Sequence, residues 1–185
     1  MSKVNSNKDT NLVWIDLEMT GLDFQKDRIT EIACLVTNEQ LEIVAEGPEK
    51  IINQPIDLYE NMDLKTRTHF EKTGFIQKVK DSKYSEKEAE DEVLEFIKTC
   101  VERGASPLCG NSVYNDRIFL SVYMKELEKY LHYRLIDVST IKNLAQRWYP
   151  ELPKYKKKDS HRVMDDIKES VAELRYYRDT LFKKN

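Results

Sequence analysis

Two carboxylates two residues apart, Asp16 and Glu18, end a short apolar segment at residues 12–17. Side chains alternate across a strand, so both should project from one face of a sheet and could hold one ion together. The chain contains 33 Asp and Glu residues, and acids at this spacing also occur by chance, as on the polar run that begins at Glu86. Asp16 and Glu18 differ because their segment has the composition of a buried strand, where an unpaired carboxylate is costly. The pattern favours a functional pair.

Two further acids stand near the expected starts of helices. Asp116 follows Asn111-Ser112, and the alternative is an ordinary first-turn acid that the helix dipole stabilises. Asp166 interrupts the apolar spacing of the last predicted helix, and His161 precedes it by five residues. Five residues of a straight helix turn through about 500°, so these two side chains would not share a face. We therefore expect His161 in the lead-in loop, able to swing toward a site that Asp166 anchors.

Four clustered carboxylates would repel one another, and hard cations that prefer oxygen ligands would remove that cost. Two divalent ions, Mg²⁺ or Mn²⁺, balance four negative charges. Such a pair supports in-line displacement at phosphorus, with a histidine that takes the proton of the attacking water. The chemistry indicated is phosphodiester hydrolysis.

Composition limits what can surround this chemistry. The 185 residues fit one domain, with 40% hydrophobic and 34% charged residues and only five Gly and five Pro. The net charge of −3 disfavours a long duplex as partner, and no run reaches the length of a membrane span. Three widely spaced cysteines indicate neither a disulfide framework nor a zinc cage. We expect a disordered extension at residues 1–10, a single domain at 11–185 and a cytoplasmic location, with mitochondrial import as the alternative.

The elements that must position these acids follow from apolar spacing. Three β-rich runs, at residues 12–17, 29–37 and 41–52, suggest an antiparallel meander, with the third broken near Gly47-Pro48. A capping box at Ser85 begins a helix that should stop at Gly104. The remaining expectations are strands at 107–110 and 133–137, helices at 116–131, 139–148 and 163–182, and a polar loop at 151–160. The order βββα, βα, βα and a last helix predicts an α/β fold.

The acids and their surroundings together resemble a known family. Asp16-Leu17-Glu18, Asp116 and His161-x-x-x-x-Asp166 stand in the order of the DEDDh 3′-to-5′ exonucleases. Within that group the chain is similar to the oligoribonuclease family, through these blocks: Trp14–Asp23, Ala45–Pro48, Gly110–Ser112, His132–Arg134 with Asp137–Thr140, and Met164–Ile167.

The resemblance implies an RNase H-like mixed β-sheet of about five strands, flanked by α-helices, and a homodimer. It implies removal of 5′-mononucleotides from very short RNAs, dinucleotides above all. The implied metal ligands for two Mg²⁺ or Mn²⁺ ions are Asp16, Glu18, Asp116 and Asp166, with His161 as general base. The implied substrate-binding residues are Leu22 as an apolar wedge between two bases, and His69, Ser112, Tyr133, Arg134 and Ser139 around a 5′-phosphate, with Tyr133 and Arg134 from the neighbouring subunit.

Taken without the resemblance, several of these residues have plainer interpretations. Leu22 is then a turn leucine in the core, Ser139 a helix N-cap and His69 a surface histidine. One position also departs from the family, because Leu64 stands where the family usually has a tryptophan that stacks on a base. Base affinity is then reduced, or another aromatic side chain such as Phe70 takes that place.

Two other functions stay open at this point. A broader DEDDh exonuclease, acting on longer RNA or DNA, would need a basic track, and the run Lys156–Lys158 is its best support, although such runs are usually only solvated. A non-catalytic RNA-binding protein would be expected to have lost acidic ligands. All four acids are present.

Overall fold

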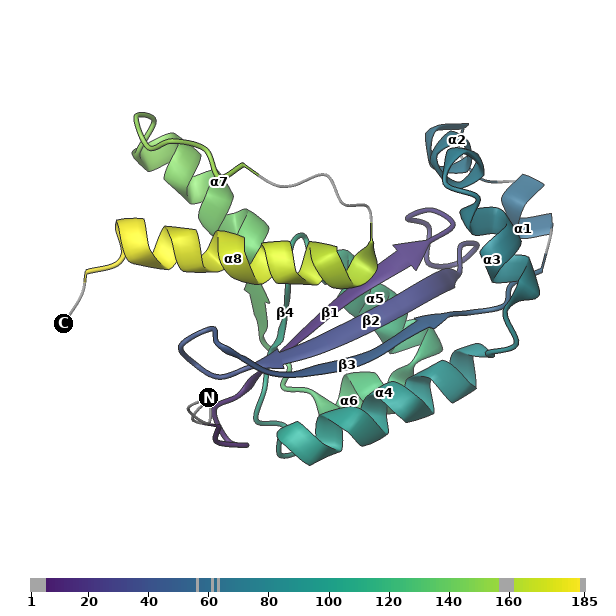
Figure 1. Cartoon of the computed structure of the whole chain (residues 1–185), viewed down its shortest axis with the longest axis horizontal. Helices are drawn as coiled ribbons and strands as arrows, with labels where there is room; N and C mark the ends of the chain where they lie inside the picture. Colours follow the sequence, from purple (N-terminus) through teal and green to yellow (C-terminus); the bar gives the residue numbers. More distant parts are fainter. Residues whose placement is uncertain (1–5, 56, 61, 63, 157–161, 184–185) are drawn as a thin grey trace.

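The computed structural model describes residues 6–55, 57–60, 62, 64–156 and 162–183. Its centre is a five-stranded sheet in the order β3-β2-β1-β4-β5 (Figure 1). β1 pairs antiparallel with β2, and β2 with β3, whereas β4 is parallel to both β1 and β5. The predicted mixed sheet, a meander followed by parallel strands, is confirmed. The strands are β1 (Leu12–Met19), β2 (Ile29–Thr37), β3 (Ile43–Ile51), β4 (Leu108–Gly110) and β5 (Leu135–Asp137).

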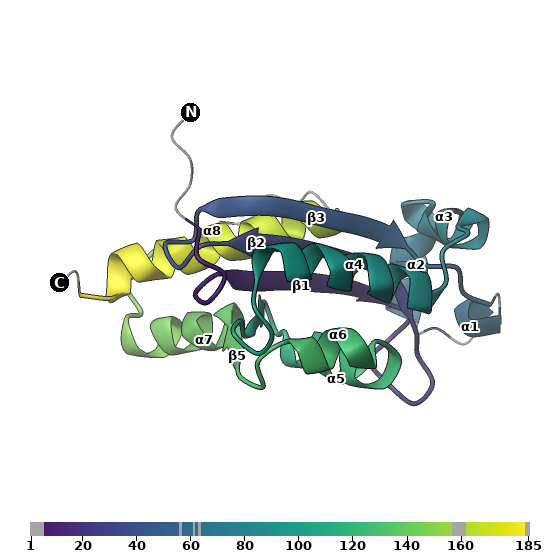
Figure 2. The ribbon, with the colours of Figure 1, turned by 90° about the horizontal axis from the view of Figure 1, so that it is seen from below.

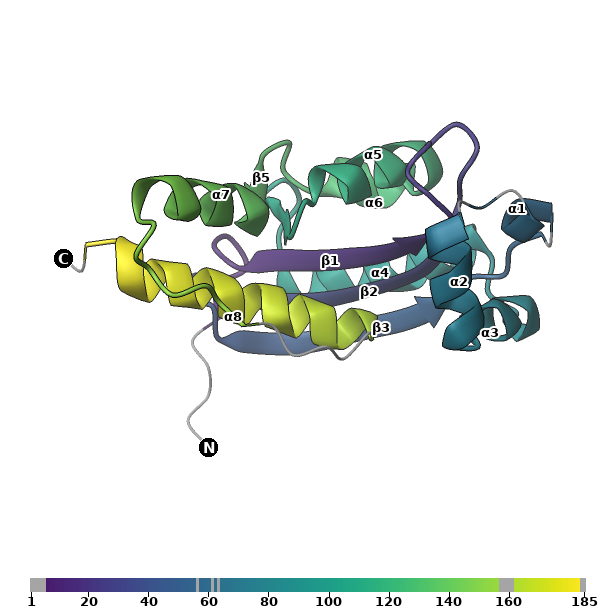
Figure 3. The ribbon, with the colours of Figure 1, turned by 90° about the horizontal axis from the view of Figure 1, so that it is seen from above.

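Helices cover both faces of this sheet. Trp14, Ala33 and Leu35 pack with side chains of α7 and α8 on one face, and the alternate residues, such as Ile15, pack with α4, α5 and α6 on the other (Figures 2 and 3). β2 is therefore buried along its whole length. The helices are α1 (Asp57–Glu60), α2 (Leu64–Lys72), α3 (Phe75–Asp81), α4 (Glu86–Cys100), α5 (Tyr114–Tyr123), α6 (Lys125–Tyr130), α7 (Val138–Trp148) and α8 (Val163–Leu181).

The third strand is continuous, so the predicted break near Gly47-Pro48 is wrong. Its pairing with β2 passes from Ala33 opposite Glu49 to Leu35 opposite Glu46, which leaves two residues of β3 opposite one of β2. This is a β-bulge. A proline is tolerated there because β3 is an edge strand and a bulge needs one ladder hydrogen bond fewer.

Two helix predictions also need correction. The capping box at Ser85 is present and α4 begins as expected, but it ends at Cys100 and Gly104 lies in the following turn, with φ of 72°. The single helix expected at 116–131 is two helices, because Met124 has φ of −131° and interrupts the helical backbone between α5 and α6.

Three short helices, α1 to α3, were not expected from the sequence. They gather at the end of the sheet to which β1 points (Figure 1), and Tyr59, Phe70 and Val79 form a small core beneath them. α2 carries few apolar residues, so its sequence lacks the periodic signal of a helix.

The chain's first described residues form a turn rather than a strand or helix. The Asn7 carbonyl accepts hydrogen bonds from the amides of Thr10 and Asn11, and the Lys8 carbonyl accepts from Glu102. Residues 1–5 lie outside the described residues, so disorder there stays a prediction. None of the described helices is both long and apolar enough to cross a membrane.

Candidate active site

The two strand carboxylates, Asp16 and Glu18, lie on β1 on the face that α8 covers. Trp14, two residues before Asp16, packs in the cluster of α7 and α8, and alternation places Asp16 and Glu18 on that same face. Both are partly buried. Glu18 pairs across the sheet with Glu31 of β2, and a bulge follows it immediately. The shared face predicted from their spacing is what the strand geometry gives.

The third carboxylate, Asp116, stands in the first turn of α5 and reaches β1. Its Oδ1 accepts a hydrogen bond from the Leu17 amide at 3.0 Å, which fixes it between the two strand acids along the chain. Only 6% of the residue is exposed. Burial raises the pKa of Asp116 to about 7, and the negative charges of Glu18 and Asp137 act in the same direction. Asp116 is therefore a buried acid close to other negative charges, which distinguishes it from an ordinary acid in the first turn of a helix.

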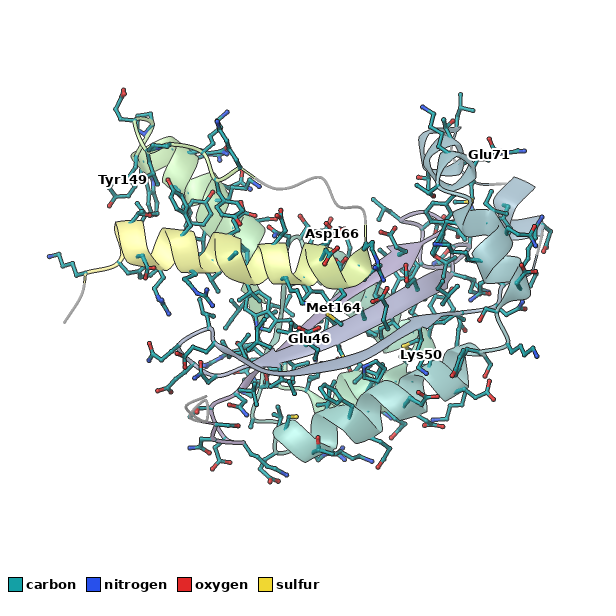
Figure 4. The ribbon with its side chains drawn as sticks, viewed as in Figure 1. Glu46, Lys50, Glu71, Tyr149, Met164 and Asp166 are labelled. Carbon is teal, nitrogen blue, oxygen red and sulfur yellow. The ribbon has the colours of Figure 1, made fainter. Side chains whose placement is uncertain are left out.

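The fourth carboxylate, Asp166, belongs to the first turn of α8. Figure 4 shows it at the helix end nearest to α2, far from Tyr149 at the end of α7. It is partly buried, and its carbonyl accepts a hydrogen bond from Ser170 Oγ at 2.9 Å. The predicted base, His161, lies outside the described residues.

On the other side of β1, two hydroxyl groups meet where β4 and β5 end. Ser112 Oγ and Ser139 Oγ are 3.1 Å apart. One oxygen of Asp137 accepts both backbone amides, from Ser112 at 3.0 Å and from Ser139 at 2.8 Å. Ser112 has φ of 52°, a conformation that costs a non-glycine residue about 1 to 3 kcal/mol. Asp137 therefore holds a strained backbone that brings the two hydroxyls together.

A side-chain network beneath these serines connects them to α8. Asn111 accepts a hydrogen bond from Ser139 Oγ at 3.0 Å and donates to Ser170 Oγ at 2.8 Å. Ser170 in turn donates to the Asp166 carbonyl. The hydroxyl pair and the helix that carries Asp166 are thus tied together through three hydrogen bonds.

Leu22 projects from the loop that follows β1, with 69% of its surface exposed. The plain interpretation of Leu22 as a core residue is therefore wrong. The Asp27 carboxylate closes the base of the loop, because it accepts from Thr20 Oγ1 and from the Asp23 amide, both at 2.8 Å. Gly21 permits this closure, since a Cβ there would lie 2.4 Å from Asp27 Oδ2. The loop is built to hold Leu22 outward.

With this geometry in place, comparisons with known proteins decide the family. Residues 13–174 match RNase_T, an exonuclease family. The oligoribonuclease of Marinobacter nauticus is 54% identical over 180 residues, 96% of this chain and 99% of that protein. The mitochondrial oligoribonuclease of Homo sapiens is 50% identical over 175 residues, 94% of this chain and 74% of that protein. The chain belongs to the oligoribonuclease family.

As a member of this family, the protein is a 3′-to-5′ exoribonuclease. The alternative of a non-catalytic RNA-binding protein is therefore removed. The solved exonuclease I of Methylocaldum szegediense has a TM-score of 0.70 at 17% identity, over 94% of this chain and 41% of that one. That similarity supports the RNase H-like fold.

The exonuclease family implies dependence on a divalent metal ion. The proposed donor set fits such an ion, because it consists of carboxylate oxygens, and burial together with the nearby Glu18 and Asp137 charges raises the pKa of Asp116. Within the described part of the chain, no three His, Cys, Asp or Glu side chains are placed so that they could hold one ion. The carboxylates therefore have the chemistry that a divalent metal ion requires, and the set of residues that bind it stays a prediction.

The other predicted substrate residues differ in where they lie. Tyr133 is 73% exposed, stacks on His132 with ring centroids 4.4 Å apart, and has the Arg134 guanidinium 5.5 Å from its ring centre. Both therefore point away from the core. His69 falls within α2, but its side chain is outside the described part of the structure. Leu64, at the start of α2, is 80% exposed.

Phe70 does not replace the missing tryptophan as an exposed stacking ring. It is 2% exposed and packs edge to face on Phe75, with 4.7 Å between ring centroids. Sequence reasoning also missed Glu31, a third acid on the same face as Glu18. Burial raises the pKa of Glu31 to about 7, and the neighbouring Glu49 and Glu18 carboxylates contribute. A signal existed, because Glu31 interrupts an otherwise apolar strand, as Asp16 and Glu18 do.

Proposed function

We propose that this enzyme removes 5′-mononucleotides from the 3′ ends of very short RNAs, with dinucleotides as its preferred substrates. The names of its relatives, oligoribonucleases of bacteria and animals, support short RNA as the substrate. The preference for two nucleotides is what the family resemblance implies, and the contacts that connect the carboxylates to the hydroxyl pair support it.

One observation carries this proposal: Asp137 interacts both with the hydroxyl pair of Ser112 and Ser139 and with the carboxylate Asp116. Its carboxylate accepts the amides of Ser112 and Ser139, and its charge helps to raise the pKa of Asp116. Asp116 itself is only four residues after Ser112. If Ser112 and Ser139 bind the 5′-phosphate and Asp116 helps to bind the scissile phosphate, little room for an onward strand is left between them.

In this proposal Asp16, Glu18, Asp116 and Asp166 hold two Mg²⁺ or Mn²⁺ ions. Bound divalent ions supply Lewis acidity, which lowers the pKa of water and stabilises charge on the phosphate. His161 takes the proton of the attacking water, as its place before α8 permits. Leu22 lies between the two bases, and His69 contributes to the phosphate site.

We further propose a homodimer in which Tyr133 and Arg134 complete the partner's site. An apolar surface supports association: Trp148, Tyr149 and Phe182 are 67%, 51% and 55% exposed, respectively. Trp148 and Phe182 line one shallow groove with Ile141 and Leu181. Exposed apolar side chains that gather at one groove are typical of interaction surfaces.

For the location of the enzyme we propose the cytoplasm. The Marinobacter nauticus relative is named simply an oligoribonuclease, whereas the human relative is named mitochondrial. Fractionation of the source cells, followed by activity measurement in each fraction, tests this assignment.

The 5′-phosphate requirement tests the function directly. We expect kcat/KM on a 5′-phosphorylated dinucleotide to exceed that on the 5′-hydroxyl form by about tenfold or more, because a hydrogen bond to a charged group contributes about 1.5 to 3 kcal/mol. Ser139→Ala should reduce this ratio. Thr140→Ala is the matched control, since Thr140 is the next residue of α7 and its side chain is exposed.

Equal rates on the two dinucleotides in the wild-type enzyme would contradict the phosphate site and favour the broader exonuclease. A Ser139→Ala enzyme that keeps the wild-type ratio would contradict the assignment of that serine. Melting temperatures of both variants show whether the fold is retained.

A further inference from the structure

A buried glutamate, Glu173, lies on α8 about two helical turns after Asp166. Its side chain has 0% of its surface exposed. Residues two turns apart lie on the same side of a helix, so α8 carries Glu173 and Asp166 along one face. Because it is fully buried, Glu173 takes no direct part in the proposed reaction.

Glu173 connects α8 to two other elements. Its Oε1 is 3.0 Å from Nζ of Lys142, which lies on α7, and its Oε2 accepts a hydrogen bond from Asn111 Nδ2 at 3.2 Å. Lys142 stands about one turn after Ser139 on α7. Asn111 directly precedes Ser112 and follows the end of β4. One carboxylate therefore holds both segments that carry the pair of serine hydroxyls.

The stability of the fold does not explain this arrangement. A buried ion pair often only just recovers the penalty of taking its charges out of water, and apolar side chains of similar volume commonly give an equally stable core. Lys142 has 35% of its side chain exposed, so solvent weakens its attraction to Glu173. A glutamate at this position is better explained by the geometry that its directional contacts impose.

Those contacts orient the side chain of Asn111. A carboxylate accepts hydrogen bonds and donates none, so the amide nitrogen of Asn111 must face Glu173. The amide oxygen then faces Ser139, and it accepts from Ser139 Oγ at 3.0 Å. The same nitrogen donates to Ser170 Oγ at 2.8 Å, and Ser170 donates to the Asp166 carbonyl. Glu173 therefore selects the orientation of Asn111 that connects the serine pair to α8.

The elements that Glu173 joins carry both ends of the proposed substrate site. The ends of β4 and β5 present Ser112 and Ser139 for the 5′-phosphate, and α8 presents Asp166 beside the scissile phosphate. A dinucleotide sets the spacing of these two phosphates. Since a misplacement of about 1 Å in a bound group can cost about a hundredfold in rate, the spacing of the elements decides which substrate length fits.

We propose that Glu173 is a positioning residue that fixes the spacing between the 5′-phosphate site and the metal-binding carboxylates through its contacts with Lys142 and Asn111, and thereby sets the preference for dinucleotides. The inference rests on the proposed function and assigns the preference to a group that contacts neither phosphate. Loss of Glu173 loosens the connection, so the dinucleotide fits less well and longer RNAs are excluded less strictly.

The test replaces the ion pair by apolar side chains of similar length. The double variant Lys142→Met/Glu173→Met should melt close to the wild-type temperature, because a buried ion pair can be replaced in this way without loss of stability. We expect the ratio of kcat/KM on a 5′-phosphorylated dinucleotide to that on the trinucleotide to fall by about tenfold. Glu173→Gln should lower the ratio less, because its one acceptor oxygen serves either Lys142 or Asn111.

The matched control is another ion pair of α8, directed toward the opposite edge of the sheet. Lys168 Nζ lies 2.8 Å from Glu46 Oε2 on β3. The double variant Lys168→Met/Glu46→Met removes the same kinds of groups and should keep the wild-type ratio. An equal fall of the ratio in this control would show that any loosening of α8 has the same effect, and it would overturn the assignment to Glu173.

Dissociation constants of the same two RNAs, measured with a chelator that prevents turnover, give a second readout. A merely structural defect weakens the binding of both RNAs alike, whereas a change of spacing alters the ratio of the two constants. Glu173→Gln preserves the shape of the side chain and gives the answer if the double methionine variant does not fold.

A folded Lys142→Met/Glu173→Met enzyme with the wild-type ratio in rate and binding overturns the inference, and so does an equal loss on both RNAs. A wild-type enzyme that cleaves the dinucleotide and the trinucleotide equally well would instead overturn the proposed preference for dinucleotides. The two failures are therefore distinguishable.

Discussion

At the scale of single residues, the buried Asp116 carboxylate lowers the free energy of unfolding of the metal-free protein. Its carboxyl group is buried, its pKa is raised to about 7, and its Oδ1 still accepts the Leu17 amide. An acid whose pKa is higher in the folded than in the unfolded state destabilises the fold as it ionises. The cost is absent below about pH 4, grows as the pH rises, and is complete above about pH 7.

Asp116→Asn should therefore stabilise the chelator-treated protein. We expect its melting temperature to rise most at pH 8 and hardly at all near pH 4, with an upper bound of about 4 kcal/mol from the shift in pKa. Asparagine keeps an oxygen for the Leu17 amide. The variant should also lose most of its hydrolytic rate with Mg²⁺ or Mn²⁺ present.

Thermal melts across this pH range, with exposed Asp81→Asn as control, check the prediction. The control should change stability by less than about 0.5 kcal/mol, as surface substitutions usually do. An Asp116→Asn protein less stable than wild type at pH 8 would show that the hydrogen bonds of the carboxylate outweigh its burial.

The same physical argument explains which residues the sequence could reveal. An acid inside an apolar strand is expensive, and this reasoning identified Asp16 and Glu18. It applies equally to Glu31, but Glu31 lies in no motif and its neighbour Glu18 is across the sheet, 13 residues away in sequence. Asn111 stands in the Gly110–Ser112 block, but its role was not predicted, because nothing local marks the hydrogen bonds it makes with Ser139 and Ser170.

At the scale of elements, hydrogen bonds hold the loop after β1 in one conformation. Asp27 accepts from Thr20 and from the Asp23 amide, and Tyr123 OH donates to the Phe24 carbonyl at 2.7 Å. These contacts anchor both ends of a loop whose tip is exposed. Asp27 is thus a positioning residue for Leu22.

Asp27→Ala should raise KM for the dinucleotide while kcat changes little. We expect about 1 to 2 kcal/mol, roughly five- to thirty-fold in KM, because the proposed apolar contact of Leu22 with the bases would be lost when the loop moves. Leu22→Ala should give a similar split. Lys26→Ala is the matched control, since the Lys26 side chain lies in the same loop and forms an exposed ion pair with Asp23 at 3.4 Å.

Steady-state kinetics of the three variants measure this split. A fall in kcat with unchanged KM in Asp27→Ala would place the loop in the chemical step instead. If Asp27→Ala matches wild type while Leu22→Ala does not, the loop does not need its carboxylate anchor.

The predictability of the elements follows from their surroundings. β2 and α4 were predictable because their sequences carry strong local signals, a β-branched run and a capping box. α2 and α3 were not, since their helical form depends on burying Phe70 and Val79 in a small separate core. The break between α5 and α6 at Met124 also depends on tertiary contacts. Glu90 of α4 accepts hydrogen bonds from the amides of Glu126 and Leu127 and fixes the start of α6.

At the scale of the whole molecule, the proposed site is shared between two subunits. Arg134 is exposed, at a distance in sequence from the carboxylates, and the apolar surface around Trp148 offers a place for a second copy. A two-fold dimer would then contain two sites, each with Asp166 from one subunit and Arg134 from the other.

Mixing two inactive variants tests this arrangement. In the proposed arrangement, Asp166→Asn lacks a metal ligand, and Arg134→Ala loses a phosphate contact that would contribute about 1.5 to 3 kcal/mol. After joint unfolding and refolding, random pairing gives about half mixed dimers, and one site in each is intact, so about a quarter of all sites should be active. Activity no higher than the average of the two parents would show that both residues serve one subunit's site.

The central claim, that the molecule measures substrate length, is tested most directly by turnover on a ladder of 5′-phosphorylated RNAs from two to about ten nucleotides. The proposed pocket at Ser112 and Ser139 closes on the 5′-phosphate, and the net charge of −3 offers no general attraction for a long strand. We predict the highest kcat/KM on the dinucleotide and a steep fall with each added nucleotide. Equal kcat/KM on two and ten nucleotides would contradict the account and identify a general 3′-to-5′ exonuclease.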